Sequence, residues 1–160
     1  MTDVKNNSNL LFLREDQLYE GIELLFFAYR DFIAECDNIL STHGLGRAHH
    51  RAIYFIARNP NISITELLEI LRITKQSLSR VLTDLADKKY IVNTQCQIDK
   101  RRRILKTTDK GRELEESLAK LHKDKLSHTY RKAGAEAVIG YRNVLLGIID
   151  DKDHKRFKNR

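Results

Sequence analysis

The chain has 160 residues, of which 41% are hydrophobic and 32% are charged. This composition is typical of a single soluble, helix-rich domain and excludes a disordered chain. The formal net charge is +7, and the segment 88–112 carries all of it, with nine Lys and Arg residues against two acids. A basic patch confined to one segment indicates a polyanionic partner, because an ordinary solvated face mixes both signs.

The ends of the chain and its cysteines restrict the class of protein further. Residues 1–9 are polar and lack the apolar core of a secretory signal, and residues 1–13 are predicted to form a flexible tail. The longest apolar run, Leu24–Ala28, is far too short to cross a bilayer. Cys36 and Cys96 are the only cysteines and do not suggest a disulfide framework. We therefore expect a cytoplasmic protein without a membrane partner.

A long amphipathic helix is predicted over about Arg14–Leu40. Its apolar residues recur in alternating steps of four and three, which is the spacing of a helix that packs along an extended partner. This seam consists of Leu18, Ile22, Leu25, Tyr29, Phe32, Cys36 and Ile39. The segment His43–Gly46 ends the helix, since glycine readily takes the left-handed geometry of a helix C-terminus. A second helix is predicted over about Arg47–Arg58.

Two short helices joined by a tight turn predict a helix-turn-helix. Ser63 and Glu66 form the S-x-x-E pattern of a capping box, which opens the first of these helices. The turn Arg72–Thr74 leads to the second helix, which Thr74 caps and which runs to about Lys89. In such a module the second helix places its N-terminal half in the major groove of DNA.

The polar face of this second helix carries the predicted base contacts. Arg forms two hydrogen bonds with guanine and Gln forms two with adenine, while Ser and Thr bind bases or phosphates. The predicted DNA contacts are Thr74, Lys75, Gln76, Ser77, Ser79, Arg80 and Thr83, with Thr74 and Lys75 at phosphates. Because every amphipathic helix has a polar face, this pattern alone does not establish DNA binding.

From Ile91 onward the hydrophobic period changes from that of a helix to that of a strand. Two strands over Ile91–Cys96 and Arg103–Thr108 are predicted to form a hairpin, here called the wing. Four consecutive cations lie at its tip: Lys100, Arg101, Arg102 and Arg103. Their mutual repulsion is unfavourable unless phosphates neutralise it, so we expect them to contact DNA, with the tip in a minor groove. Asp99 is expected to support the wing by orienting the guanidinium of Arg101.

A helix from Asp109 and a last helix over about 138–149, separated near Gly134, complete the predicted order. We therefore expect a mainly α fold with a small β-hairpin wing. In this fold, residues 43–108 form a winged helix-turn-helix. The N- and C-terminal helices, residues 14–42 and 109–157, form a dimerisation region around it, because their apolar stripes bracket the winged segment in sequence.

The wing and the helix before it resemble those of the MarR family of bacterial regulators. The wing pattern of that family is similar to D-x-R-x-x-x-L-x-L-T-x-x-G. It stands here as Asp99, Arg101, Leu105, Thr107, Thr108 and Gly111, with Thr107 in place of the usual Leu. The segment 73–80 is similar to the start of the family's recognition helix, and the segment 46–51 resembles a subgroup that includes the PetP-like and LdtR-like regulators.

The resemblance implies a homodimer, held by its N- and C-terminal helices, that binds a pseudo-palindromic operator, commonly as a repressor. It also implies release of DNA when a small, often phenolic, ligand enters the crevice between the dimerisation and DNA-binding regions. Family topology places Phe32, Cys36, His50, Arg51 and Tyr54 at such a crevice. No cofactor is expected.

Other interpretations use the same residues. A non-specific or architectural nucleic-acid-binding protein would use the same basic segment. A redox-sensing regulator would use Cys36, although a cysteine at a seam position usually acts as a small apolar residue. A metal site is not expected, because His49 and His50 point about 100° apart on a helix and no Cys or carboxylate joins them at a recognised spacing. We do not expect an enzyme, since the sequence carries none of the familiar catalytic motifs.

Overall fold

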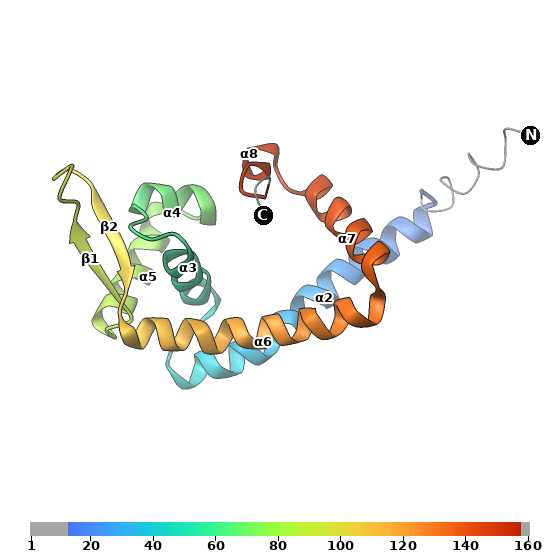
Figure 1. Cartoon of the computed structure of the whole chain (residues 1–160), viewed down its shortest axis with the longest axis horizontal. Helices are drawn as coiled ribbons and strands as arrows, with labels where there is room; N and C mark the ends of the chain where they lie inside the picture. Colours follow the sequence, from blue (N-terminus) through green and yellow to red (C-terminus); the bar gives the residue numbers. More distant parts are fainter. Residues whose placement is uncertain (1–12, 158–160) are drawn as a thin grey trace, which may run out of the picture. The chain divides into compact units, whose positions relative to one another are not determined.

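The computed structural model describes residues 13–157. In chain order its elements are α2 (Glu15–Thr42), α3 (Arg47–Arg58), α4 (Ile64–Leu71), α5 (Lys75–Asp87), β1 (Ile91–Gln95), β2 (Arg103–Thr107), α6 (Asp109–Ala133), α7 (Ala135–Ile148) and α8 (Asp151–His154) (Figure 1). This order confirms the predicted mainly α fold with a small hairpin, whereas the short α8 was not predicted. The predicted tail lies outside the described residues except for Leu13.

The helix ends follow from local signals in the sequence. Gly44 takes a φ of 63° directly after α2, as expected for a glycine at a helix C-terminus. At the start of α4, the backbone N–H of Glu66 donates to Ser63 Oγ (3.2 Å) and the N–H of Ser63 donates to the Glu66 carboxylate (2.7 Å). The predicted capping box is thus confirmed. Thr74 caps α5 as predicted, because its Oγ1 accepts from the N–H of Ser77 at 3.1 Å.

The chain forms two compact units, Met1–Leu121 and His122–Arg160. The core of the first unit draws on α2 to α6 and on both strands. Its largest fully buried side chains are Cys36, Leu40, Ile53, Ile56, Leu67, Leu78, Leu85, Ile91, Leu105 and Leu118. The end of α2 and the first turns of α6 therefore share one core with the helix-turn-helix and the wing. The division into a dimerisation region and a DNA-binding region, predicted as parts of one intertwined domain, stays a prediction.

The wing is joined to the helix-turn-helix along its strand β2. β1 and β2 pair antiparallel over their whole length, and each ends one residue earlier than predicted. The N–H of Leu105 donates to the carbonyl of Ile62 (2.8 Å), and Ser63 forms an isolated bridge with Ile104. The segment that precedes α4 thus lies against β2 like a short third strand.

The base of the wing packs closely against the start of α6. A Cβ atom on Gly111 would lie 1.9 Å from the carbonyl oxygen of Tyr90, so only glycine fits at this position. Thr108 Oγ1 donates to the carbonyl of Lys89 (2.7 Å) and accepts from the N–H of Gly111 (3.0 Å). These contacts give a structural reason for two residues of the wing pattern, Thr108 and Gly111.

The second unit has an exposed apolar face on α7. No residue of α7 is buried, and Ile139, Val144 and Ile148 are each more than 60% exposed. Within the unit, the rings of Tyr130 and Tyr141 meet edge to face with centroids 6.1 Å apart. No helix within residues 13–157 combines the length and apolarity that crossing a bilayer requires.

Candidate nucleic-acid interface

Helix α5 is fixed to the protein by its apolar face and by a polar contact near its C-terminal end. Leu78, Leu82 and Leu85 are buried in the core. His49 Nδ1 accepts from the N–H of Gly46 (3.1 Å), and its Nε2 lies 2.9 Å from Asp84 Oδ2. Asp84 also pairs with Lys88, and this hydrogen bond is the main cause that lowers the pKa of Asp84.

The opposite face of α5 is exposed, as predicted. It presents Lys75, Gln76, Ser77, Ser79, Arg80 and Thr83 to solvent. Two of the predicted contacts already have partners within the protein, because Thr74 Oγ1 donates to Ser77 Oγ at 2.8 Å. In the described part of the chain, the side chains of Gln76 and Arg80 have no hydrogen bond or ion pair with the protein. Gln76 and Arg80 are therefore long side chains on this face that are available for base edges.

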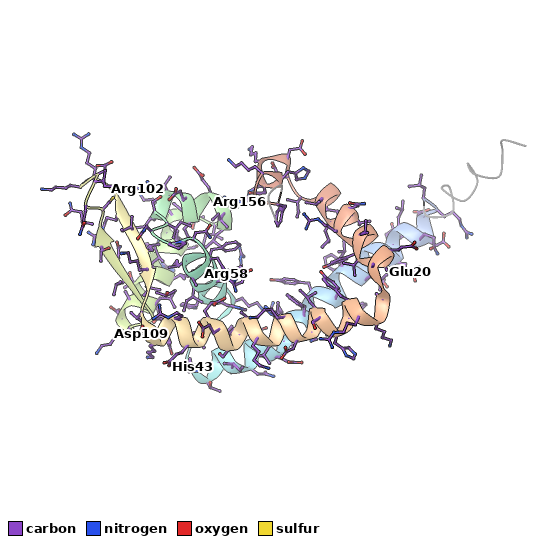
Figure 2. The ribbon with its side chains drawn as sticks, viewed as in Figure 1. Glu20, His43, Arg58, Arg102, Asp109 and Arg156 are labelled. Atoms are coloured by element: carbon purple, nitrogen blue, oxygen red, sulfur yellow. The ribbon has the colours of Figure 1, made fainter. Side chains whose placement is uncertain are left out.

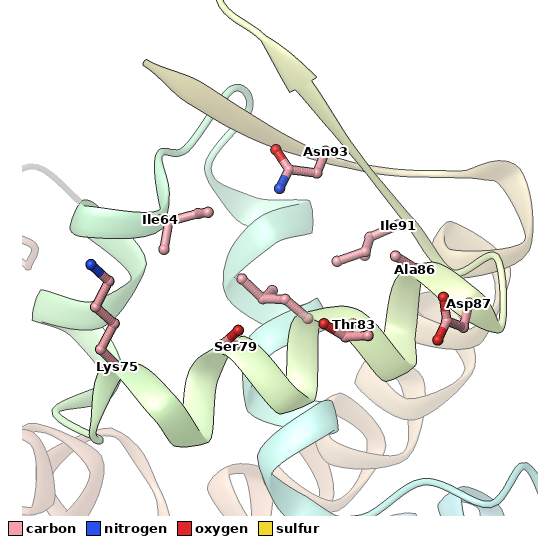
Figure 3. A pocket seen from close by; sticks show the side chains of 9 residues that line it. Ile64, Lys75, Ser79, Thr83, Ala86, Asp87, Ile91 and Asn93 are labelled. Carbon is pink, nitrogen blue, oxygen red and sulfur yellow. The ribbon is translucent and has the colours of Figure 1, made fainter. Parts of the chain in front are cut away.

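A hollow of about 320 Å³ lies between α5 and the wing (Figure 3). Lys75, Ser79 and Thr83, spaced four residues apart, line it from one edge of α5, and Ile91 and Asn93 line it from β1. Three of the predicted α5 contacts, Lys75, Ser79 and Thr83, thus lie on the edge of α5 that faces the wing. A duplex that follows α5 would meet the polar rim of this hollow and the wing together.

The wing tip is a turn held by Asp99, but not through the contact that the sequence suggested. Asp99 Oδ1 accepts from the backbone N–H of Arg101 at 3.0 Å, and the Asp99 carbonyl accepts from the N–H of Arg102 at 2.9 Å. The expected bond to the guanidinium of Arg101 is therefore corrected to a bond with its backbone. A short carboxylate reaches the amide two residues on with no ordering of a long side chain, which explains the preference.

The four cations at the tip have different surroundings. Arg102 Nη2 donates to Glu66 Oε2 at 2.6 Å, and Arg103 Nε donates to Asn93 Oδ1 at 3.0 Å. Figure 2 shows Arg102 at the outer end of the hairpin. Within residues 13–157, the side chains of Lys100 and Arg101 have no such partner. The structure thus leaves Lys100 and Arg101 free for phosphates and holds the other two against the protein.

Glu66 is a residue that the sequence assigned only to a helix cap. Its carboxylate accepts from the N–H of Ser63, the hydroxyl of Ser63 and the guanidinium of Arg102. These bonds, with the Ser63 N–H first, lower the pKa of Glu66 from 4.5 to about 2. The partner on the wing lies far along the chain, so no local pattern in the sequence indicates it.

The residues expected at an effector crevice fall into two groups. Cys36 is fully buried, with its Sγ 3.7 Å from the carbonyl of Leu118, and its Sγ lies within 4.8 Å of a ring nitrogen of His50. Phe32, on the same helix as Cys36, is half-buried. The resemblance to the MarR family had placed Cys36 and His50 at one crevice, and the structure brings these two residues together from α2 and α3.

The second group lies on α3. Arg51 Nη2 donates to the carbonyl of Leu71 at 2.8 Å and so ties α3 to the end of α4. The Cζ atom of Arg58 lies over the ring of Tyr54, 5.5 Å from the centroid of that ring. Arg51 therefore has a structural contact that the sequence did not predict. His43 and His49 contact other residues: His43 Nδ1 lies 2.9 Å from Tyr90 Oη, and His49 faces Asp84.

Known proteins resemble this chain in sequence and in fold. The sequence model of the MarR family matches residues 43–102. The HTH-type transcriptional regulator PetP of Rhodobacter capsulatus is 43% identical over 157 residues, which cover 98% of this chain and 95% of PetP.

Solved structures of MarR-type proteins share the fold at low sequence identity. FabT of Streptococcus pneumoniae, solved in complex with DNA, has a TM-score of 0.72 at 19% identity and covers 81% of this chain and 94% of its own. NadR in complex with 4-hydroxyphenylacetate has a TM-score of 0.66 at 22% identity, with 78% and 88% covered. A mutant MarR from E. coli, complexed with operator DNA, has a TM-score of 0.66 at 19% identity, with 84% and 97% covered. These likenesses establish the winged-helix fold.

Proposed function

This chain belongs to the MarR family of transcriptional regulators, and we propose that it binds a pseudo-palindromic operator as a homodimer, most simply as a repressor. The observation that carries the proposal is the exposed polar face of α5 beside a cationic wing, both built on one core. Regulators of this family are generally not enzymes. The family relationship implies DNA binding.

The proposed contacts divide into base readers and phosphate contacts. Gln76 and Arg80 reach base edges, with Ser77, Ser79 and Thr83 close to the same groove. Thr74 and Lys75, at the N-terminus of α5, bind phosphates, where the helix dipole also favours negative charge. Lys100 and Arg101 bind the backbone or the minor groove from the wing tip.

The homodimer is supported by apolar surface that the single chain leaves in water. On α2, the first four seam residues are 45–54% exposed: Leu18, Ile22, Leu25 and Tyr29. The remaining seam residues of α2 are buried or half-buried within the chain. The N-terminal half of α2 therefore lacks the packing partner that its apolar spacing predicts. Soluble monomers rarely expose such a continuous stripe. Two-fold symmetry would place the two α5 helices roughly 34–36 Å apart, one turn of DNA.

We also propose that a small-molecule ligand controls DNA binding. NadR has been solved with 4-hydroxyphenylacetate, which is a property of that protein. We infer that a small molecule, often phenolic in such regulators, also modulates this chain, by favouring a conformation in which the two α5 helices no longer match the operator. Addition of candidate phenolic acids to the protein–operator complex tests this, and a lack of any shift in affinity across such a panel would count against a phenolic effector.

A second candidate, a regulator that senses zinc or an oxidant, is favoured by the proximity of Cys36 and His50. Thiolate and imidazole are ligands that zinc prefers, and a cysteine thiol is the group that peroxide oxidises. The test is operator affinity with and without zinc chloride or hydrogen peroxide, for the natural chain and for Cys36→Ser. A response that the variant loses supports sensing, and an identical response in both proteins rules out a role for Cys36.

The experiment that tests the main proposal is the selection of bound fragments from a genomic DNA pool at near-physiological salt. A recovered palindrome with half-sites about 10 bp apart supports a sequence-reading dimer. Tight, salt-sensitive binding without any motif would instead favour the non-specific or architectural protein, which uses the same basic segment.

A further inference from the structure

The carboxylate of Glu66 connects the first helix of the helix-turn-helix to the wing. Its Oε2 accepts from the N–H and Oγ of Ser63, both at 2.7 Å, and from Arg102 Nη2 at 2.6 Å. The bonds with Ser63 hold the carboxylate in place whether or not Arg102 is present, since they belong to the cap of α4. Arg102 therefore meets an acceptor that is already ordered, which lowers the entropy cost of the ion pair.

This pair acts on the part of the wing that is otherwise unsupported. The inner half of the wing is tied to the protein by the bond from Leu105 to Ile62 and by the contacts of Thr108. In the described part of the chain, residues 93–103 make one polar contact outside the hairpin, which is the ion pair of Arg102 with Glu66. The other bonds of this segment, such as that of Arg103 with Asn93, stay within the hairpin.

We propose that Arg102 is a positioning residue of the wing rather than a DNA contact, and that Glu66 is the acceptor that fixes it. The pair sets the angle at which Lys100 and Arg101 reach the DNA beside α5. The inference rests on the proposed function, because it assigns roles within the same DNA-binding surface. It also revises the expectation from sequence that all four cations of the tip bind phosphate.

The negative charge of Glu66 leads to opposite predictions for its two possible roles. If Glu66 were only an acid near DNA, its removal would strengthen binding, because repulsion from the phosphates would fall. If Glu66 positions the wing, its removal weakens binding although the protein becomes more positive. An exposed ion pair in each of two wings corresponds to a loss of about 2- to 30-fold in affinity. The sign of the change therefore separates the two roles.

The first test compares Glu66→Gln with Glu69→Gln on the selected operator. Gln retains the shape of Glu and serves in a capping box, so α4 remains capped. Glu69 is an exposed acid on the same helix and is the matched control. We expect Glu69→Gln to bind as well as the natural chain or slightly better, and Glu66→Gln to bind more weakly. Equal or tighter binding by Glu66→Gln would overturn the proposal.

The second test uses the dependence of affinity on salt and does not disturb the helix cap. Arg101→Gln, which loses a phosphate contact, should flatten the slope of log affinity against log salt by about one unit for each protomer. Arg102→Gln should weaken binding with the slope unchanged, and the double variant with Glu66→Gln should lose no more than either single variant. A slope that Arg102→Gln flattens as Arg101→Gln does would overturn the proposal. The affinity of the natural chain for the operator and for unrelated DNA is measured first. Equal affinities would show that the proposed function itself fails.

Discussion

Replacement of Arg80 by Ala tests base reading by α5 most sharply. Arg80 lies on the exposed face, while Leu78, Leu82 and Leu85 hold the helix from the buried face. We therefore expect the variant to fold with a stability within about 0.5 kcal/mol of the natural chain. Loss of a guanidinium that forms two hydrogen bonds with guanine costs about 1–3 kcal/mol in each half-site. A homodimer has two such contacts, so the dissociation constant should rise by roughly 30-fold to 10⁴-fold.

The assay is fluorescence anisotropy on the selected operator and on a set of operators with single base-pair changes in both half-sites. Arg80→Ala should bind nearly all of them more weakly, but it should lose its disadvantage on the operator that lacks the contacted guanine. Arg112→Ala serves as the control, because its guanidinium pairs with Asp109 on α6 and lies off the α5 face. An equal loss for Arg80→Ala on every operator would refute base reading, since it would show a contact with the phosphate backbone alone.

Three further predictions concern assembly, packing and pH. Leu25→Glu puts a charge on the exposed seam of α2 and should convert a dimer to a monomer in sedimentation equilibrium, whereas the control Glu23→Gln on the same helix should leave the dimer intact. A dimer that survives Leu25→Glu would place the interface elsewhere. Gly111→Ala would bring a Cβ to 1.9 Å from the Tyr90 carbonyl oxygen, so it should lower the free energy of unfolding by about 1–3 kcal/mol in urea titrations. An unchanged free energy of unfolding would mean that the base of the wing moves freely. The pKa of Glu66 is lowered to about 2, so the stability that its ionised form contributes is complete above the unfolded value of 4.5 and is lost as pH falls toward 2. The difference in unfolding free energy between the natural chain and Glu66→Gln should therefore shrink between about pH 6 and pH 3, and a difference independent of pH would contradict the cause given for the shift.

Local signals in the sequence predicted the elements well. The bounds of α3 were predicted at both ends, and the caps at Ser63 and Thr74 are formed as expected, because a cap depends on residues within one helical turn. The wing was predicted from a change of hydrophobic period and from its pattern of Thr108 and Gly111. The structure explains that pattern by the close approach of Gly111 to Tyr90.

The contacts that were not predicted join residues far apart in the chain. The pair of Arg102 with Glu66 arises only when the wing and α4 meet in the fold. The contact of Asp99 was expected on the guanidinium of Arg101 and is found on its backbone, since composition reveals a charge pair but not the geometry of a turn. The seam of α2 was predicted as one stripe, yet the fold buries only its C-terminal part and leaves the remainder for a partner.

In the proposed complex, the two α5 helices of one dimer read two successive major grooves. Hydroxyl-radical footprinting of the selected operator, with the protein-to-DNA ratio determined on the same complex, tests it most directly. We expect two symmetric protected regions about 10 bp apart on one face of the duplex, with two chains bound for each operator. A single protected region with one chain bound, or protection spread evenly along the fragment, would contradict it.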